Sequence, residues 1–221
     1  ARMPNGLAFE QAAAVPRAGV TALQGLRDTA QVEPGHLVLI NGASGGVGTF
    51  AIQVAKALGA EVTGVCSARN AELVSRLGAD HVVDYAAEDF TTHRMYDVIF
   101  DNVGNRSLSE LRRALKPGGV LIPNSNKGDA RWLGHYVRRA LRSIVTSPFV
   151  SQRLRPFAAK SSREDLETLS SLIETGRLTP VVDRTYEIEE TAEALRNYGT
   201  GHASGKVIIK VNQDEARDGG G

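Results

Sequence analysis

A glycine-rich stretch, Asn41-Gly42-Ala43-Ser44-Gly45-Gly46-Val47-Gly48, has the composition of a phosphate-binding turn. The apolar run 37–40 before it is typical of a buried strand, and residues 49–58 after it follow helical periodicity. Glycines allow a tight turn close to a pyrophosphate, and the N–H groups that start the helix attract the anion. We therefore expect a dinucleotide-binding turn; the alternative is a turn that binds nothing. The expected contacts are Gly42, Ser44, Gly45, Gly46 and Val47.

The residues after the next expected strand, 61–65, indicate which dinucleotide binds. An NAD site usually carries Asp or Glu about 20 residues past the glycines, where the carboxylate bonds the ribose hydroxyls. This chain has Cys66-Ser67-Ala68-Arg69 there instead. Ser67 and Arg69 can hold a 2′-phosphate by charge-assisted hydrogen bonds. The sequence thus favours NADP(H) over NAD(H), with Arg69 as a merely solvated charge as the alternative.

The glycine-rich stretch belongs to a series of alternating strands and helices. Further strands are expected at 82–83, 97–101 and 120–122, and helices at 70–77 and 108–115, the latter stopped by residues 116–119. Before the first strand, two short helices, 8–14 and 18–30, are expected around Pro16. This alternation predicts an α/β fold, a Rossmann-type doubly wound parallel sheet with helices on both faces.

Beyond Pro123 the alternation changes. We expect a basic amphipathic helix at 131–145, a strand near 154–158, a helix at 163–174, an extended segment at 179–188, a helix at 189–198 and a strand at 206–211. The basic helix either lies on a membrane surface or packs on the protein or on a dimer partner. The balanced charge of the chain favours packing.

Composition narrows the class of protein. The chain has 221 residues and a net charge of +1, which gives no reason to expect nucleic acid or an acidic membrane as partner. Cys66 is the only cysteine, so no disulfide framework is expected, and a cytoplasmic location fits best. No apolar run is long enough to span a membrane. Because motif-bearing sequence begins almost at once and without Met, we expect the later part of a longer protein.

Several spaced blocks together resemble one family. They are Gly42–Gly48, Leu77–Tyr85, Asp101–Gly104, Leu115–Gly119 and Gly205–Ile209. In this order they resemble the zinc-independent, quinone-oxidoreductase-like branch of the medium-chain dehydrogenase/reductase superfamily, over residues 8 to 211. The resemblance implies further cofactor contacts: Thr21 near the nicotinamide ring, Tyr85 beside the 2′-phosphate, Asn102, Val103, Asn124 and Ser125 along the cleft, and Lys206, which matches the family's lysine after a glycine near the C-terminus.

The resemblance also bears on zinc and on domains. Zinc-dependent relatives place a cysteine ligand where this chain has Arg17, so no metal site is expected. The five histidines are expected at the surface: His36, His81, His93, His135 and His202. The resemblance implies a β-rich, GroES-like catalytic domain ahead of these residues, and we expect the catalytic residues to be in that domain. The expected division is 1–30 as its edge, 31–176 as the dinucleotide-binding domain, 177–212 as a segment returning to it, and 213–221 as a disordered tail.

These observations predict an NADPH-dependent oxidoreductase that transfers hydride, without zinc, to a small-molecule electron acceptor such as a quinone, an enal or an enone. Two alternatives stay open. One is a non-catalytic module that binds or senses NADPH, and the other is an alcohol dehydrogenase of the same superfamily. The absence of a zinc site to polarise the substrate oxygen counts against the second. The resemblance leaves a homodimer open.

Overall fold

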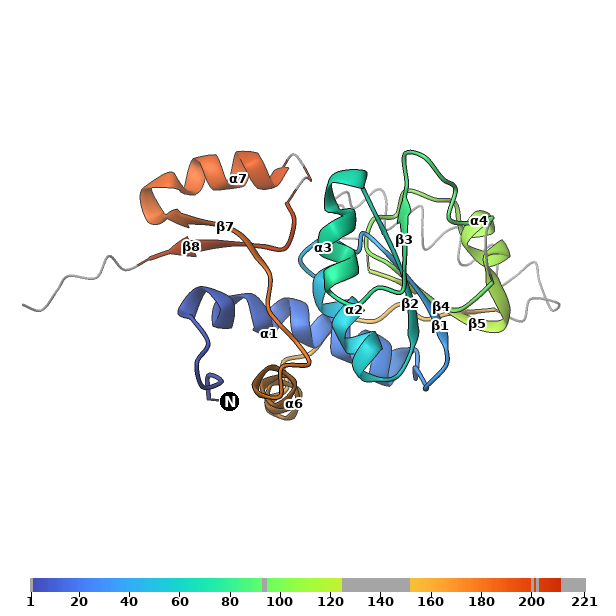
Figure 1. Ribbon diagram of the computed structural model, residues 1–221, viewed down its shortest axis with the longest axis horizontal. Coiled ribbons are helices and arrows are strands. Elements are labelled where there is room, and N and C mark those ends of the chain that lie inside the picture. The colour runs from blue at the N-terminus through green and yellow to red at the C-terminus, as the bar shows by residue number, and fades with distance from the viewer. Residues whose placement is uncertain (1, 93–94, 125–151, 200, 202, 212–221) are drawn as a thin grey trace, which may run out of the picture.

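The structure, a computed structural model, describes residues 2–92, 95–124, 152–199, 201 and 203–211. Its main feature is a six-stranded parallel sheet in the order β3-β2-β1-β4-β5-β6 (Figure 1). The strands are β1 (Leu37–Asn41), β2 (Glu61–Cys66), β3 (His81–Asp84), β4 (Tyr96–Asp101), β5 (Leu115–Pro123) and β6 (Arg153–Leu154). This is the strand order of a doubly wound Rossmann sheet, so the predicted α/β class is confirmed.

Helices fill the connections between the strands. They are α1 (Phe9–Leu23), the π-helix η1 (Gln24–Thr29), α2 (Gly48–Ala57), the 3₁₀-helix η2 (Ala68–Asn70), α3 (Ala71–Arg76), α4 (Leu108–Arg113), α6 (Arg163–Glu174), the 3₁₀-helix η3 (Ile188–Glu190) and α7 (Thr191–Gly199). The predicted helices 49–58, 70–77, 108–115, 163–174 and 189–198 all correspond to one of these, within a few residues at each end.

Both faces of the sheet are buried. In β1, Val38 and Ile40 belong to an apolar cluster formed with α1, η1 and α2, while Leu39 between them belongs to a second cluster formed with α4. The alternation follows from the two-residue period of a strand. Because each central strand packs against helices on both sides, its residues read as one apolar run rather than as alternating apolar and polar positions.

The expectation of two short helices around Pro16 is wrong, because α1 is one continuous helix with Pro16 inside it. Proline has no N–H to donate to the carbonyl of Ala12. Pro16 lies on the exposed face of α1, where water is available to that carbonyl. On the opposite face Ala14, Val15 and Ala18 are buried. Packing of this face against the core keeps the helix continuous across the proline.

Two further expectations near β5 are corrected. Residues 116–119, expected to stop a helix ahead of a strand at 120–122, lie inside β5, where the pairing with β4 shifts from Tyr96–Leu115 to Val98–Val120. The extra residues form a bulge, and Gly118 there has a φ of +79°. The strand expected at 154–158 covers only Arg153–Leu154. The basic helix expected at 131–145 lies outside the described residues.

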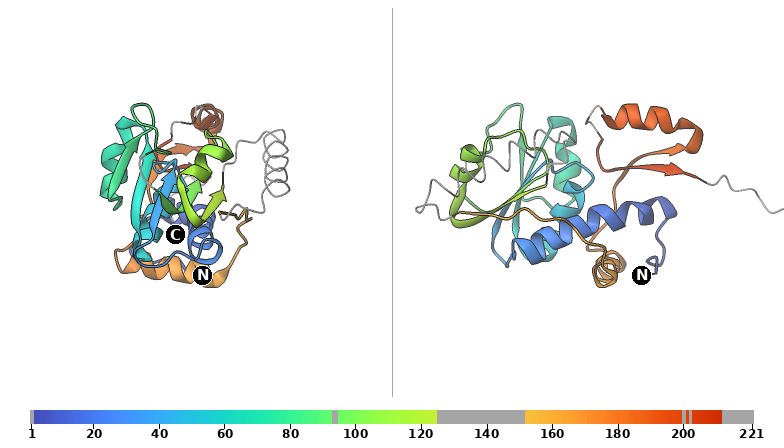
Figure 2. Two further views of the ribbon diagram at one scale, coloured as in Figure 1. Left: turned by 90° about the vertical axis from the view of Figure 1, so that its right-hand side faces the viewer. Right: turned by 180° about the vertical axis from the view of Figure 1, so that it is seen from behind.

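A second, two-stranded parallel sheet stands beside the first. It pairs β7 (Val182–Glu187) with β8 (Lys206–Lys210). Helix α7 covers one side of this sheet and the first half of α1 lies on the other, as the views from both sides show (Figures 1 and 2). The strands fall within the predicted 179–188 and 206–211 segments. Their proposed return to a β-rich domain, and the other domain boundaries, stay predictions.

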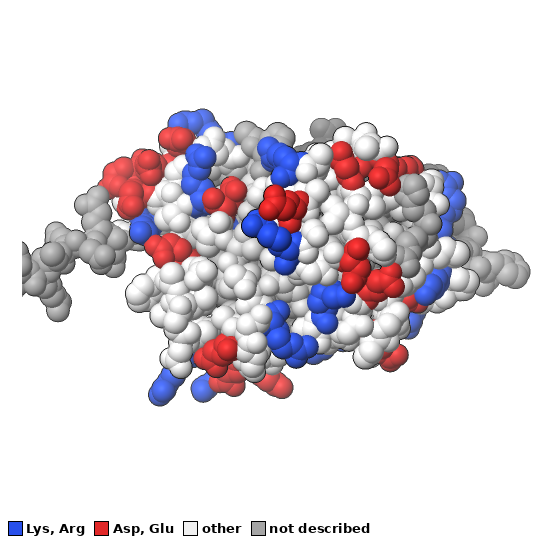
Figure 3. Space-filling view, in the orientation of Figure 1, with Lys and Arg blue, Asp and Glu red and all other residues white. Residues whose placement is uncertain are grey.

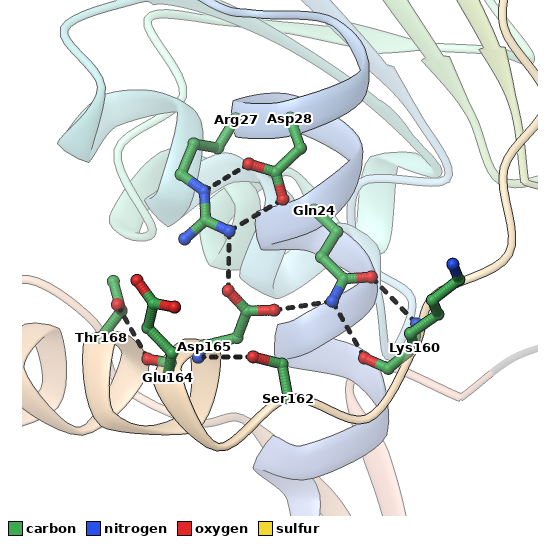
Figure 4. A network of polar contacts seen from close by, with 8 residues as sticks. All are labelled: Gln24, Arg27, Asp28, Lys160, Ser162, Glu164, Asp165 and Thr168. Carbon is green, nitrogen blue, oxygen red and sulfur yellow. Dashed lines mark hydrogen bonds and ion pairs between the residues drawn. The ribbon is translucent and has the colours of Figure 1, made fainter.

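Helix α6 is joined to the C-terminal end of α1 and to η1 by a polar network centred on the buried Asp165 (Figure 4). Gln24 Nε2 donates a 2.6 Å hydrogen bond to one carboxylate oxygen, and Arg27 Nη2 donates a 2.7 Å bond to the other. Arg27 is also paired with Asp28 at 2.6 Å. The backbone N–H of Lys160 donates to Gln24 Oε1 at 3.0 Å. These contacts fix the chain that returns after β6 against α1.

The surface carries both signs of charge. On the face seen in Figure 3, lysine and arginine side chains alternate with aspartate and glutamate over most described parts of the chain. Many of them form ion pairs, such as Lys56 with Asp80 at 2.8 Å. Among the described helices, none combines the length and the apolar composition that crossing a membrane requires.

Candidate cofactor-binding site

The predicted site residues that follow strands meet at one edge of the main sheet. All strands are parallel, so their carboxyl ends share this edge. Strand β1 lies in the middle, with β2 on one side and β4 on the other. The chain leaves β1 toward β2 and β3 on one side, whereas β4, β5 and β6 form the half of the sheet on the other side. Ligands of open α/β sheets bind at such a switch point.

The glycine-rich turn leaves β1 at this point and is in direct contact with the end of β4. Gly42 has a φ of +76°, a backbone conformation that favours glycine. A Cβ on Gly42 would lie 2.8 Å from Cγ2 of Val103. A Cβ on Gly48 would collide with the carbonyl oxygen of Gly42. The two glycines therefore allow the tight turn and the close approach of α2 to β1.

The turn presents the start of α2 to the same edge. Gly45 N–H donates to the Gly42 carbonyl at 3.1 Å, and Thr49 N–H donates to the Gly45 carbonyl at 2.9 Å. Val47, which lies between Gly45 and Thr49, is the N-cap of α2. Within the described part of the chain its N–H donates to no other group. A free N–H at the positive end of a helix fits a phosphate oxygen.

The loop after β4 is held by a buried carboxylate. Oδ1 of Asp101 accepts hydrogen bonds from Asn41 Nδ2 at 2.8 Å, from Val103 N–H at 3.1 Å and from Gly104 N–H at 3.0 Å. Asn41 Nδ2 also donates to Asn105 Oδ1 at 2.9 Å. Sequence reasoning missed Asp101, because only the fold reveals that its carboxylate bridges two strand ends.

Three asparagines form a chain across the edge. The backbone and side-chain N–H groups of Asn102 both donate to the carbonyl of Asn41, each at 3.1 Å. Asn124 Nδ2 donates to Asn102 Oδ1 at 2.7 Å. The predicted residues Asn102 and Asn124 are thus in contact, and their hydrogen bond joins the ends of β4 and β5. Ser125, predicted beside Asn124, lies outside the described residues.

The residues predicted to choose between NADP and NAD lie at the ends of β2 and β3. Ser67 is partly exposed and precedes η2, while Arg69 and Tyr85 are exposed. Tyr85 N–H donates to the Cys66 carbonyl at 3.1 Å, which brings Tyr85 beside Ser67. The pairing of Cys66 with Asp84 also brings a carboxylate to this edge. Its Oδ1 accepts a 3.1 Å hydrogen bond from Ala86 N–H in the loop after β3.

Lys206, predicted from the far end of the chain, lies on the glycine-rich turn. A Cβ on Gly46 would stand 2.7 Å from Cδ of Lys206, and Gly45 forms a parallel β-bridge with Gly205. Burial, and then the nearby cation of Arg17, lowers the pKa of Lys206. No carboxylate pairs with Lys206 among the described residues, so the turn carries an uncompensated positive charge.

Asn70 is a site residue that sequence reasoning missed. Its side chain, buried at the end of η2, donates from Nδ2 to Ser44 Oγ at 3.0 Å. Its Oδ1 accepts a hydrogen bond from Ser204 Oγ at 2.8 Å. Asn70 therefore joins the glycine-rich turn to the segment that carries Lys206. No local pattern marks this role, because Ser204 lies 134 residues away in sequence.

Thr21 is the predicted contact with the fewest links to the others. It lies on the buried side of α1, and its Oγ1 donates to the carbonyl of Arg17 at 2.7 Å, one turn earlier in the helix. The hydroxyl proton of Thr21 is therefore used within the helix. Toward a ligand, Oγ1 can only accept a hydrogen bond.

Groups of three or more His, Cys, Asp or Glu side chains suited to a metal ion do not occur among the described residues. His81 is exposed and pairs with Glu61 at 3.0 Å, and His36 Nδ1 accepts a 3.2 Å hydrogen bond from Glu33 N–H. The other three histidines, His93, His135 and His202, lie outside the described residues. The zinc independence of the reaction stays a prediction.

Comparison with known proteins agrees with this geometry. A quinone oxidoreductase from Coxiella burnetii has a matching structure with a TM-score of 0.82 and 30% identity, over 96% of this chain and 64% of that one. A chloroplast envelope quinone oxidoreductase homolog of Arabidopsis thaliana is 32% identical over 95% of this chain and 64% of its own length. The mitochondrial NAD(P)H oxidoreductase RTN4IP1 of Mus musculus is 33% identical over 94% of this chain and 57% of its own length.

The chain thus spans about six-tenths of the length of these relatives. Since their names place two of them in different organelles, the cytoplasmic location predicted for this chain stays a prediction. The model of the family described as zinc-binding dehydrogenase matches residues 77–209, which is more than half of the chain. The chain therefore belongs to the zinc-binding dehydrogenase family of the medium-chain dehydrogenase/reductase superfamily.

Proposed function

We propose that this chain provides the NADP(H)-binding part of an oxidoreductase that reduces a quinone, an enal or an enone without zinc. One observation carries the proposal: the glycine-rich turn at the switch point combines the Val47 N–H with the cation of Lys206, and neither has a partner among the residues that the structure describes. Both groups favour an anion. Gly46 leaves the room in which the Lys206 side chain crosses the turn, because a Cβ there would lie 2.7 Å from Cδ of Lys206. The residues present fit the pyrophosphate of a dinucleotide.

NADP(H) is proposed over NAD(H) from the ends of β2 and β3. The hydroxyl of Ser67 and the guanidinium of Arg69 supply donors for a 2′-phosphate, and exposed Tyr85 follows β3 beside Ser67. Asp84 is the competing carboxylate at this edge. Its hydrogen bond to Ala86 N–H ties it to its own loop, and we propose that it does not take the role of the ribose-binding acid.

When bound, the nicotinamide ring of the cofactor supplies the hydride. The chain's own task is to hold that half of the molecule over the carboxyl ends of β4 and β5. Asn102 and Asn124, fixed to each other and to Asn41, offer a rigid polar floor, and Val103 offers an apolar surface beside it. Rigid contacts of this kind orient a reacting ring without reorganising during the reaction.

The names of the relatives support the proposed acceptor class, and Arg17 supports a reaction without zinc. Quinone oxidoreductases and a trans-enoyl reductase of Aspergillus terreus are among the relatives, the latter at 30% identity. Arg17 stands at the position where the resemblance places a zinc ligand in zinc-dependent members. A guanidinium is no zinc ligand, so we propose a reaction that needs no metal to polarise the acceptor.

Fluorescence titration with NADPH and with NADH tests the cofactor. We expect NADPH to bind at least tenfold more tightly; equal affinities would contradict the NADP assignment, and no binding of either would contradict the function. Oxidation of NADPH with a panel of quinones and enones, on this chain and on a version extended at its N-terminus, tests the reaction. Binding without turnover in both would favour a sensing module instead.

A further inference from the structure

Three segments that are far apart in sequence meet at the side chain of Asn70. The glycine-rich turn contributes Ser44, whose Oγ accepts from Asn70 Nδ2 at 3.0 Å. The segment before β8 contributes Ser204, whose Oγ donates to Asn70 Oδ1 at 2.8 Å. Asn70 itself ends η2, directly after Arg69, and is only 9% exposed. A buried amide with both of its ends bonded has one fixed orientation.

These hydrogen bonds have a direction. A serine hydroxyl has one proton to donate and two lone pairs to accept with. Ser44 accepts from Asn70, so its proton stays available for another group, and among the described residues no group accepts it. Ser204 uses its proton on Asn70. The chain of donors therefore runs from Ser204 through Asn70 to Ser44 and ends in a free O–H at the glycine-rich turn.

The segment from Ser204 to Lys206 contacts Asn70 through Ser204 and the turn through its last two residues. Gly205 bridges to Gly45, with a φ of +114° and so little space that a Cβ would lie 2.7 Å from the Val181 carbonyl oxygen. Lys206 N–H donates to the same carbonyl at 2.9 Å, and its side chain crosses Gly46. The position of the Lys206 cation is thus set by the backbone of a segment that Ser204 anchors to Asn70.

We propose that Asn70 is a positioning residue of the phosphate site. It aims the Ser44 hydroxyl at a phosphate oxygen of the dinucleotide, and it holds the Ser204–Lys206 segment so that the Lys206 cation faces the same phosphate. The donor, the cation and the Val47 N–H then converge on one anion. This inference rests on the proposed function, because it names how that same site is assembled.

Substitution of Asn70→Asp tests the direction of the hydrogen bonds that run from Ser204 through Asn70 to Ser44. The carboxylate keeps the shape of the amide but has no proton to donate, so it would accept the Ser44 proton and add a negative charge beside the phosphate. We expect the dissociation constant for NADPH to rise at least tenfold, about the effect of losing one charge-assisted hydrogen bond. The urea midpoint of unfolding reports the purely structural effect of the substitution.

Asn197→Asp is the matched control. Asn197 is also an asparagine whose Nδ2 bonds a hydroxyl, that of Tyr186 at 2.9 Å, but the bond stays within the unit of β7 and α7. We expect this variant to lower stability without changing the NADPH dissociation constant more than twofold. If both variants weaken binding equally, Asn70 has only a structural role and the inference is overturned.

Asn70 is proposed to act through two contacts, one with Ser44 and one with Ser204, and a double-mutant cycle tests the contact with Ser44. If Asn70 acts through the Ser44 hydroxyl, Asn70→Ala should weaken NADPH binding much less in a Ser44→Ala background than in the unchanged chain. Additive effects would overturn the role of that contact. For the contact with Ser204, Ser204→Ala should weaken NADPH binding several-fold and speed hydrogen exchange of the backbone N–H of Lys206. This mild variant also keeps the test intact if Asn70→Asp does not fold.

The outcomes distinguish this inference from the function on which it rests. If the unchanged chain binds neither NADPH nor NADH, the proposed function fails and the inference fails with it. If the unchanged chain binds NADPH and folded Asn70→Asp binds it equally well, only the inference fails. Tighter binding of NADPH by Asn70→Asp would contradict the direction of the hydrogen bonds themselves.

Discussion

Gly42 and Val103 are packed so closely that a Cβ on the glycine would lie 2.8 Å from Cγ2 of the valine. The contact joins the first residue of the glycine-rich turn to the loop after β4, which lie side by side at the switch point of the sheet. The parts of the candidate site that we propose for the phosphates and for the nicotinamide ring therefore meet at this contact. A substitution at either residue should affect both parts.

Gly42→Ala should destabilise the chain more than Gly35→Ala. Both glycines have a positive φ, +76° for Gly42 and +83° for Gly35, so an alanine costs about 1 kcal/mol at each through backbone strain. Gly35 has open space around it, whereas Gly42 faces Val103. We expect a further loss of about 1–3 kcal/mol from the collision. Urea unfolding measures the difference in the free energy of unfolding. Equal losses in the two variants would show that Val103 moves aside at no cost.

Asp101→Ala should affect both stability and cofactor binding, whereas Asp97→Ala should affect stability alone. Asp101 serves three donors at the carboxyl end of β4. Asp97, near the other end of β4, accepts 2.8 Å hydrogen bonds from Leu37 N–H and Lys116 Nζ. Each loss leaves donors without an acceptor, at about 1–3 kcal/mol. Only Asp101 shapes the loop that carries Asn102, so only its loss should weaken NADPH binding, by about tenfold in a fluorescence titration.

Arg69→Ala should remove the preference for NADPH. The guanidinium is expected to pair with the 2′-phosphate, which NADH lacks, so the NADPH dissociation constant should rise about tenfold while that for NADH stays within twofold. Arg76→Ala is the control, since Arg76 is an exposed arginine of α3 at 4.0 Å from Glu72. A parallel loss for both nucleotides in Arg69→Ala would refute a role in discrimination.

Most of the fold is readable in the sequence because the strands of a doubly wound sheet are buried on both faces. The runs around Val38, Val62 and Ile99 are mostly apolar and alternate with helical patterns, so the strands and their succession along the chain can be predicted. Pro16 misled the prediction because local propensity argues for a break. Burial of the opposite face of α1 decides instead, and that burial is a tertiary effect.

The site is readable only where backbone geometry needs a particular residue. Gly42 and Gly48 identify the turn because a Cβ on Gly42 would lie 2.8 Å from Val103 and a Cβ on Gly48 would collide with the backbone of the turn itself. Asn70 carries no such mark: its partners lie 26 and 134 residues away, and an asparagine after a strand is usually a turn residue. Long-range side-chain pairing of this kind depends on the packed fold, so no periodicity or spacing announces it.

The carboxylate of Asp165 should make stability depend on pH in the acid range. Burial acts to raise its pKa, but the hydrogen bonds from Gln24 and Arg27 outweigh burial and hold the pKa below the ordinary value of 3.8. A carboxylate with a depressed pKa in the folded state stabilises that state above its unfolded-state pKa. This contribution is lost as the pH falls through the lower folded-state pKa.

Asp165→Asn should therefore lower the free energy of unfolding by about 2 kcal/mol at pH 7, with a difference from the unchanged chain that shrinks below about pH 4. Glu167→Gln is the control on the same helix, because Glu167 is an exposed residue that pairs with Arg163 at 2.8 Å. Its effect should be close to zero at every pH. Urea unfolding between pH 3 and pH 7 measures both variants. A constant difference for Asp165→Asn across this range would mean that the ionised carboxylate does not hold α6 against α1.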